Sequence, residues 1–223
     1  MGETVQETLE SLSLANRRIR DRVNTGRRHA IRDREFLRNL TRFFRPGPIL
    51  ELGASTGHLA AILQEYGHEV TASEVEPKLV QAIAARGVEA VLVDATKDIV
   101  SQTGHSFPNI LAQGVSPLIE RDRPQVLATL RHIRAALDTS GRFICIGPYA
   151  WRQPNPKLFF SPREQIALAC ASGLFRMVAC FPHQVLPPAL YRPWNARLLN
   201  LLDHKLAHIA STRLVWVMEK AEI

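Results

Sequence analysis

The chain has 223 residues, of which 46% are hydrophobic and 22% charged, and its formal net charge is +7. This length is enough for one α/β domain with a full core, and the composition is that of a soluble globular protein. No apolar run reaches the ~20 residues that cross a bilayer, and the first residues lack the basic and apolar regions of a signal peptide. Three cysteines without a CxxC spacing argue against a disulfide framework or a metal site, so we expect a cytoplasmic protein.

The positive charge lies at the two ends of the chain. Residues 1–47 and residues 152–223 each carry a net charge of +5, whereas residues 48–151 carry −3. Basic ends attract an anionic substrate, a nucleic acid or a membrane surface. Solvated, arginine-rich helix faces explain the same charges equally well, so the charge pattern leaves both interpretations open.

Hydrophobic periodicity predicts two N-terminal helices, at residues 4–23 and 30–44. From Pro46 onward, short apolar strands alternate with helices, which is typical of βαβ units and a parallel sheet. The predicted strands are residues 49–52, 69–73, 88–93, 109–113, 142–146, 175–181 and 212–218. The predicted helices among them are residues 59–66, 77–86, 123–137, 161–172 and 194–210, the fourth of which begins at a capping box.

A loop with two glycines, Gly53-Ala54-Ser55-Thr56-Gly57, joins the first predicted strand to a helix. Such a loop surrounds a ligand with backbone N–H groups and a helix N-terminus, and glycine lets the ligand approach the backbone closely. A dinucleotide fingerprint would need glycine at positions 53, 55 and 58, where this chain has Gly53, Ser55 and His58. The spacing therefore argues against a dinucleotide site. We expect Thr56 to cap the helix that follows.

Further motifs follow this loop in chain order. Glu74 directly follows the second predicted strand, 23 residues after Glu51, and Asp94-Ala95 directly follow the third. Residues 107–115 contain the fourth strand, and residues 137–144 contain a turn and the start of the fifth. Together with the Glu51-x-Gly-x-Ser-x-Gly loop, these segments resemble the motifs of class I, Rossmann-like S-adenosylmethionine-dependent methyltransferases. Two positions depart from the family pattern: Ser55 replaces a glycine, and Pro108 replaces a frequent aspartate.

The resemblance covers residues 47–146 and implies a fold and an activity. The fold is a seven-stranded, mostly parallel Rossmann-like sheet with an antiparallel last strand, helices on both faces and an N-terminal helical cap. We expect one methyltransferase domain over residues 1–223, with the cap at 1–46, the cofactor-binding core at 47–150 and a substrate-side part at 151–223. The implied activity is methyl transfer from S-adenosyl-L-methionine, with S-adenosyl-L-homocysteine as product.

The resemblance also implies the cofactor site. By position, Glu74 accepts the ribose hydroxyls, Asp94 accepts the adenine amino group, the Ala95 N–H meets the adenine ring, and Glu51 orients the loop or meets the methionine amino group. The full set of implied cofactor residues is Glu51, Gly53, Ala54, Ser55, Gly57, Glu74, Val75, Asp94, Ala95 and Gln113.

Methyl transfer to some oxygen or nitrogen atoms is assisted by a base. We expect such a base among the side chains that follow the carboxyl ends of strands, where the ligand binds. Tyr149 follows the fifth predicted strand and His183 follows the sixth, and these two are the candidates. His204 and His208 are four residues apart on a predicted helix but lack a third ligand, so we expect no metal site.

The identity of the methyl acceptor is constrained mainly by sequence motifs that this chain lacks. Enzymes that methylate the amino groups of adenine or cytosine carry an Asn/Asp-Pro-Pro-Tyr type motif after the fourth strand, where this chain has Gln113-Gly114-Val115-Ser116. Cys145 lies inside a predicted strand and is typical of a core residue rather than a cytosine-C5 nucleophile. We therefore expect a small or medium-sized organic acceptor, methylated on oxygen or nitrogen. The alternatives are a nucleic-acid methyltransferase, a protein that binds the cofactor without transferring methyl, and a scaffolding partner; a monomer and a homodimer both stay open.

Overall fold

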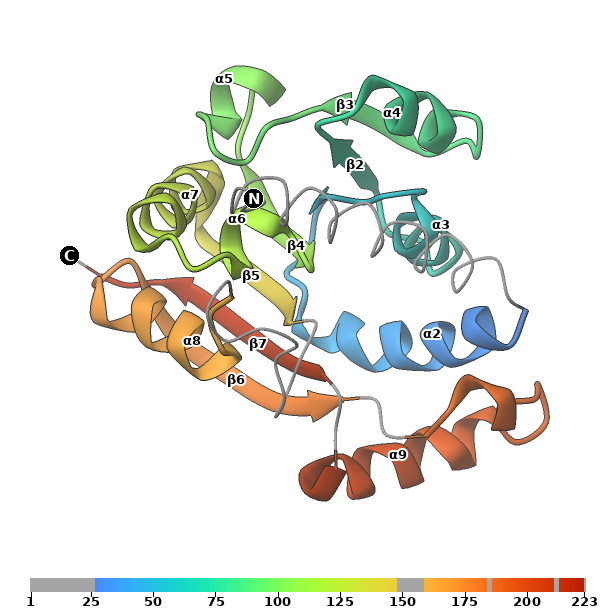
Figure 1. Cartoon of the computed structure of the whole chain (residues 1–223). Helices are drawn as coiled ribbons and strands as arrows, with labels where there is room; N and C mark the ends of the chain where they lie inside the picture. The colour runs from blue at the N-terminus through green and yellow to red at the C-terminus, as the bar shows by residue number, and fades with distance from the viewer. Residues whose placement is uncertain (1–26, 148–158, 184–185, 211–212, 223) are drawn as a thin grey trace, which may run out of the picture.

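Figure 1 shows the computed structural model of the chain, which describes residues 27–147, 159–183, 186–210 and 213–222. The described strands form one seven-stranded sheet in the order β3-β2-β1-β4-β5-β7-β6. The strand bounds are β1 (Ile49–Leu52), β2 (Val70–Glu74), β3 (Glu89–Leu92), β4 (Phe107–Gln113), β5 (Leu137–Gly147), β6 (Phe175–His183) and β7 (Arg213–Lys220).

The pairing of the strands confirms the predicted mostly parallel sheet. β1 pairs in parallel with β2 on one side and with β4 on the other, so that Leu50 lies opposite Thr71 and Ile110. β7 lies between β5 and β6 and is antiparallel to both, as predicted for the last strand. The chain builds outward from β1 to β3 and then returns to place β4 on the other side of β1. At such a reversal of strand order, the carboxyl ends of the strands open a crevice for a ligand.

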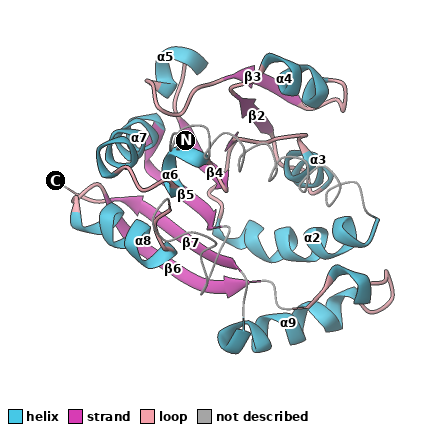
Figure 2. Cartoon of the chain, viewed as in Figure 1, coloured by secondary structure: helices cyan, strands magenta, loops and turns pink. Residues whose placement is uncertain are grey.

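Helices cover both faces of the sheet (Figure 2). On one face lie α2 (Arg27–Leu40), α3 (His58–Glu65) and α4 (Pro77–Ala84). On the other lie α5 (Ile99–Thr103), α6 (Ser116–Ile119), α7 (Arg123–Ala136) and α8 (Pro162–Ala171). The remaining helices are α9 (Ala196–Ala210) and the 3₁₀ helices η1 (Thr41–Phe43) and η2 (Pro188–Leu190). No helix within the described ranges has the length and apolar character needed to cross a membrane.

The strands are buried on both sides, and their side chains alternate between two apolar cores. In β5, Phe143 and Cys145 belong to the core under α7 and α8, whereas Ile144 and Ile146 belong to the core under α2 and α3. Cys145 is buried, as expected for a core residue, and burial raises the pKa of its thiol. The same alternation in β1 turns the side chain of Glu51 toward the face covered by α3.

Several element boundaries differ from those predicted. β5 begins at Leu137 and includes the predicted turn, because residues 138–141 bulge opposite Pro108, which has no N–H to donate to the sheet. The second predicted helix begins earlier, at Arg27, and ends at Leu40, and its last turn is 3₁₀. The helix predicted at residues 4–23 lies outside the described residues. The short helices α5 and α6 were not predicted, since one turn is too short to show a helical period.

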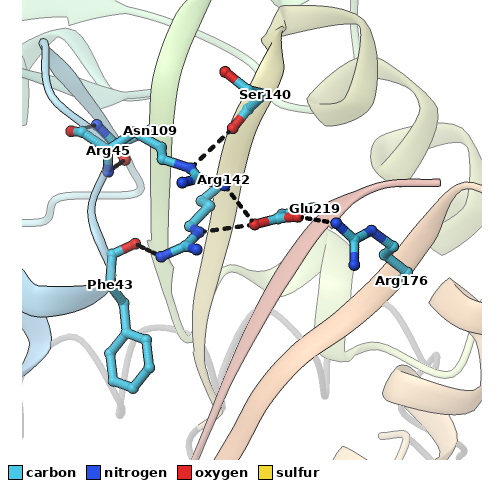
Figure 3. A network of polar contacts seen from close by, with 7 residues as sticks. All are labelled: Phe43, Arg45, Asn109, Ser140, Arg142, Arg176 and Glu219. Atoms are coloured by element: carbon cyan, nitrogen blue, oxygen red, sulfur yellow. Dashed lines mark hydrogen bonds and ion pairs between the residues drawn. The ribbon is translucent and has the colours of Figure 1, made fainter. Parts of the chain in front are cut away.

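A network of ion pairs around Glu219 joins the three strands on one side of the sheet (Figure 3). Glu219 of β7 accepts hydrogen bonds from Arg142 of β5 at 3.0 Å, from Arg176 of β6 at 2.5 Å and from Arg45 at 2.9 Å. Arg142 also donates to the carbonyl oxygen of Phe43 at 2.8 Å. Burial acts to raise the pKa of Glu219, but the three arginines outweigh it and lower the pKa below its usual range. The network thereby fixes the segment after α2 to the far half of the sheet.

Candidate functional site

A cavity of about 180 Å³ lies at the carboxyl ends of β1 to β4. Among the residues predicted to bind a cofactor, it brings together Gly53, Ser55, Glu74, Val75, Asp94 and Ala95. Its walls include further residues outside the implied set of cofactor residues: Leu52, Leu79, Val93, Gly114, Val115, Ser116 and Pro117. Four predicted residues do not line it: Glu51, Ala54, Gly57 and Gln113.

The loop after β1 is shaped by left-handed backbone at alternate positions, with φ of 66° at Gly53, 55° at Ser55 and 71° at Gly57. A Cβ on Gly53 would lie 3.0 Å from the side chain of Val115 across the cavity. A Cβ on Gly57 would lie 3.1 Å from Ile83 of α4, so this glycine is needed for backbone conformation and helix packing. Ser55 adopts the same left-handed conformation at a cost of about 1 kcal/mol.

Glu74 ends β2 with its carboxylate held against the cavity. One carboxylate oxygen, Oε1, accepts the backbone N–H of Ser55 at 2.7 Å, and Oε2 accepts the N–H of Val75 at 3.1 Å. Each oxygen keeps further acceptor capacity, since a carboxylate oxygen has two lone pairs. Two fixed, neighbouring acceptors are suited to a pair of adjacent hydroxyl groups on a ligand.

Asp94 follows β3, and its position depends on α5. Gln102 of α5 accepts the Asp94 N–H at 2.8 Å and donates to the Asp94 carbonyl oxygen at 3.0 Å. The Asp94 carboxylate accepts the N–H and hydroxyl of Thr96 and pairs with Lys97 at 3.2 Å. Burial acts to raise the pKa of Asp94, but these hydrogen bonds and the Lys97 charge outweigh it and lower the pKa. Asp94 is therefore an ionised acceptor at neutral pH.

Glu51 lies under the loop rather than in the cavity wall. Its side chain is only 2% exposed and accepts the backbone N–H of Ala60 in the first turn of α3. Its second carboxylate oxygen, Oε2, is buried and has no hydrogen-bond partner among the described residues. Burial raises the pKa of Glu51 to about 8, and the nearby charge of Glu74 adds to this effect. Glu51 thus links β1 to α3 and keeps one acceptor unused.

The expectation for Thr56 fails, and Gln113 lies outside the cavity wall. Thr56 was predicted to cap α3, but the N-cap residue is Gly57, which makes no side-chain capping hydrogen bond. The Thr56 hydroxyl is buried and has no hydrogen-bond partner in the part of the chain that the structure describes. Gln113 does not reach the cavity, because the chain turns at Gly114, whose φ is 62°, and continues into α6. Residues 114–117 form that wall instead. The sequence carried a signal for this turn, since Pro117 in the first turn of α6 is a common helix start.

A buried ion-pair cluster joins α2 to the start of α3. Asp33 lies 2.8 Å from the guanidinium of Arg32 and 3.2 Å from Nε2 of His58, which immediately follows the loop. Burial by itself would raise the pKa of Asp33, but the hydrogen bonds and charges of His58 and Arg32 outweigh it and lower the pKa to about 2. Arg32 is itself buried, so α2 is not simply a solvated arginine-rich face. Sequence reasoning did not single out Asp33 or His58.

His183, one of the two catalytic candidates, ends β6 at the same edge of the sheet as the cavity but does not line it. Its ring is buried and stacks on Phe36 of α2, with the ring centroids 3.6 Å apart. Burial lowers the pKa of His183 well below its ordinary value, and the nearby Arg213 and Arg32 add to this effect, so the imidazole is neutral. The other candidate, Tyr149, lies outside the described residues. No cluster of three or more metal-ligating side chains occurs in the described part of the chain.

Comparison with known proteins finds likeness in structure alone. No protein-family model matches the sequence, and no curated protein matches it significantly. The CcbJ methyltransferase from Streptomyces caelestis is 16% identical, with 85% of this chain and 90% of that chain covered and a TM-score of 0.61. A SAM-dependent methyltransferase from Archaeoglobus fulgidus is 14% identical over 91% and 98% of the two chains, with a TM-score of 0.65.

A third similar structure holds the cofactor that the sequence motifs imply. The glycopeptide N-methyltransferase MtfA, complexed with S-adenosyl-L-methionine, is 14% identical over 85% of this chain and 87% of that chain, with a TM-score of 0.62. At these identities the likeness concerns the fold. The chain therefore has the fold of the class I, Rossmann-like S-adenosylmethionine-dependent methyltransferases.

Proposed function

We propose that this chain transfers a methyl group from S-adenosyl-L-methionine to a small or medium-sized organic acceptor, on oxygen or nitrogen. The observation that carries this proposal is the pair of carboxylates Glu74 and Asp94. They lie at the carboxyl ends of the neighbouring strands β2 and β3 and line one cavity, which the loop at residues 53–57 borders. The class I fold supports the same cofactor, and methyl transfer from it would give S-adenosyl-L-homocysteine as the product.

The residues present fit this cofactor in their chemistry. Glu74 would accept the two ribose hydroxyls, and Asp94 with the Ala95 N–H would meet the adenine. Apolar walls from Leu79, Val93 and other side chains suit a purine ring. The unused buried oxygen of Glu51 is suited to the positively charged amino group of the methionine end.

When bound, the cofactor supplies an activated methyl carbon on a sulfonium, and the protein contributes position and electrostatics. Ser55 and Val75 hold the Glu74 carboxylate in place before any ligand arrives. Gln102 does the same for Asp94 through its backbone. His183, a neutral imidazole at the acceptor edge, and Tyr149 stay proposed as acceptor-side catalytic residues.

An organic acceptor is supported by the similar structure of MtfA, which is named as a glycopeptide N-methyltransferase. The second candidate is a nucleic-acid acceptor, which the net charge of +5 at each end of the sequence favours. Salt-dependent retention of the full chain on RNA or DNA tests this second candidate, because absence of retention at low salt would remove it.

The test of the cofactor site is calorimetric titration of S-adenosylmethionine and S-adenosylhomocysteine into the wild type, Glu74→Gln and Asp94→Asn. Each variant loses a charge-assisted acceptor, and we expect roughly 10- to 100-fold weaker binding. Glu69→Gln is the matched control, since Glu69 is exposed just before β2, at the opposite end from Glu74. Failure of either ligand to bind the wild type at high micromolar concentration would overturn the proposal, as would unchanged affinity in Glu74→Gln. Release of S-adenosylhomocysteine with candidate acceptors then tests methyl transfer.

A further inference from the structure

One side of α9 exposes large apolar side chains to solvent. Trp194, just before the helix, is 84% exposed, and Leu198, Leu201, Leu202 and Leu206 are between 41% and 62% exposed. Their spacing of three and four residues places them along one side of the helix. We call these five residues the α9 face. Apolar side chains gathered on the surface in this way mark an interaction site rather than a scatter of single exposed residues.

The packing of α9 shows why this side faces outward. The helix packs against α2 and β6 (Figure 1). The residues that it buries there include polar ones, Asn200 and Asp203, together with Ala196. Asp203 accepts the backbone N–H of Leu186 at 2.6 Å, which holds the polar side of the helix inward. The helix is therefore inverted relative to an ordinary surface helix, whose apolar side is the buried one.

The charges around the α9 face are basic. Arg197 and Lys205 are exposed beside its leucines, whereas Asp203, which is buried, is the sole acidic residue in α9. Leucines and a tryptophan bordered by Arg and Lys characterise helices that lie in the interface of an anionic membrane. In a symmetric dimer through this face, the same patch would meet itself and bring like charges together. The charge pattern thus favours anionic lipid over a second copy of the chain.

The connectivity places α9 at the same end of the strands as the cavity. α9 follows the carboxyl end of β6 and leads into the start of β7, so it lies at the edge of the sheet where the cavity opens. We propose that the α9 face binds an anionic membrane surface and turns this edge of the sheet toward the lipid. The consequence for the acceptor rests on the proposed function: an acceptor taken up at this edge is amphiphilic and held in the membrane.

The test is co-sedimentation of the full chain with vesicles of phosphatidylcholine alone or mixed with phosphatidylglycerol. We expect binding to the anionic vesicles and a blue shift of tryptophan emission that is lost in Trp194→Phe. Leu198→Ser combined with Leu201→Ser should weaken binding by about 10-fold or more, because apolar burial drives interfacial binding. Arg197→Glu and Lys205→Glu should each weaken it by at least ~5-fold, which corresponds to the ~1 kcal/mol of one basic side chain at an anionic surface.

Matched controls lie on another part of the molecule. Leu92 is 54% exposed on the edge strand β3, and Arg86 is exposed after α4. Leu92→Ser and Arg86→Glu should bind vesicles as the wild type does. Calorimetry of all variants with S-adenosylmethionine keeps failure of this proposal distinct from failure of the cofactor proposal.

Four results would overturn the membrane proposal. The first is absence of vesicle binding by the wild type, and the second is unchanged binding in the double leucine variant. The third is a dimer in sedimentation velocity that Leu201→Ser dissociates while vesicles bind neither form, which would identify a second copy as the partner. Shielding of Trp194 from acrylamide in the free monomer would likewise overturn it, since the face would then be covered within the chain.

Discussion

At the scale of a single residue, two effects on the charge of Glu51 oppose each other. Its burial disfavours the carboxylate, whereas the proposed cofactor presents a positive amino group that needs one. In the folded chain Glu51 keeps its proton up to a pKa of about 8, but in the unfolded chain it loses the proton near 4.5. The free energy of unfolding therefore falls as the pH rises from about 4.5 to about 8, because the unfolded state binds fewer protons over this range.

Glu51→Gln tests this balance, since glutamine keeps the shape and removes the ionisation. We expect the variant to be more stable than the wild type by at least about 1 kcal/mol near pH 8, with little difference near pH 4. Its affinity for S-adenosylmethionine should fall by about 10-fold, because a charge-assisted hydrogen bond is lost. Urea unfolding at both pH values and calorimetry measure the two effects. Lower stability of Glu51→Gln near pH 8 would contradict the assignment.

At the scale of elements, short helices and turns position several residues of the site. α5 is a helix of 5 residues, yet its Gln102 fixes both backbone groups of Asp94. The chain turn into α6 supplies a wall of the cavity at residues 114–117. The cluster of Arg32, Asp33 and His58 joins α2 to the start of α3, directly beside the loop. The geometry of the site therefore depends on α5 and α6, which are too short to show a helical period, as well as on the longer helix α2.

The Glu219 network allows a comparison of two arginines that bind the same carboxylate. Arg142 is largely buried and also donates to Phe43, whereas Arg176 is 63% exposed. We expect Arg142→Ala to lower the free energy of unfolding by about 3 kcal/mol, because it removes one partner of a buried pair. Arg176→Ala should cost less than about 1 kcal/mol, since solvent screens an exposed pair. Equal losses in urea unfolding of the two variants would show that burial does not govern this network.

At the scale of the whole molecule, a ligand that binds the folded chain stabilises all of it. S-adenosylmethionine at about 100 times its Kd should raise the free energy of unfolding by about 2.7 kcal/mol. For a chain of this size, the corresponding rise in Tm is roughly 5–10 °C. NAD⁺ is the control in the same thermal-shift measurement, because the loop lacks the GxGxxG spacing. A rise of the same size with NAD⁺, or none with S-adenosylmethionine, would contradict the proposed cofactor.

The antiparallel last strand was an implication of the family resemblance. The sequence by itself determined the alternation of strands and helices and the acidic residues at the ends of β2 and β3. These features depend on local patterns: apolar periodicity, proline and glycine at helix ends, and acidic residues after short apolar runs. Glu74 and Asp94 were predictable for this reason, because a residue that ends a parallel strand lies at the ligand edge of the sheet.

Only the tertiary structure decided which groups meet across elements. Among the described residues it gave the Thr56 hydroxyl no hydrogen-bond partner, and it placed residues 114–117 rather than Gln113 in the cavity wall. It buried Arg32 and Asp33 in a helix whose charge pattern had left two interpretations open. It also turned the leucines of α9 outward, although a period of three to four residues marks a stripe without stating which way it faces. Each outcome follows from contacts between residues distant in the chain, where packing overrides local preference.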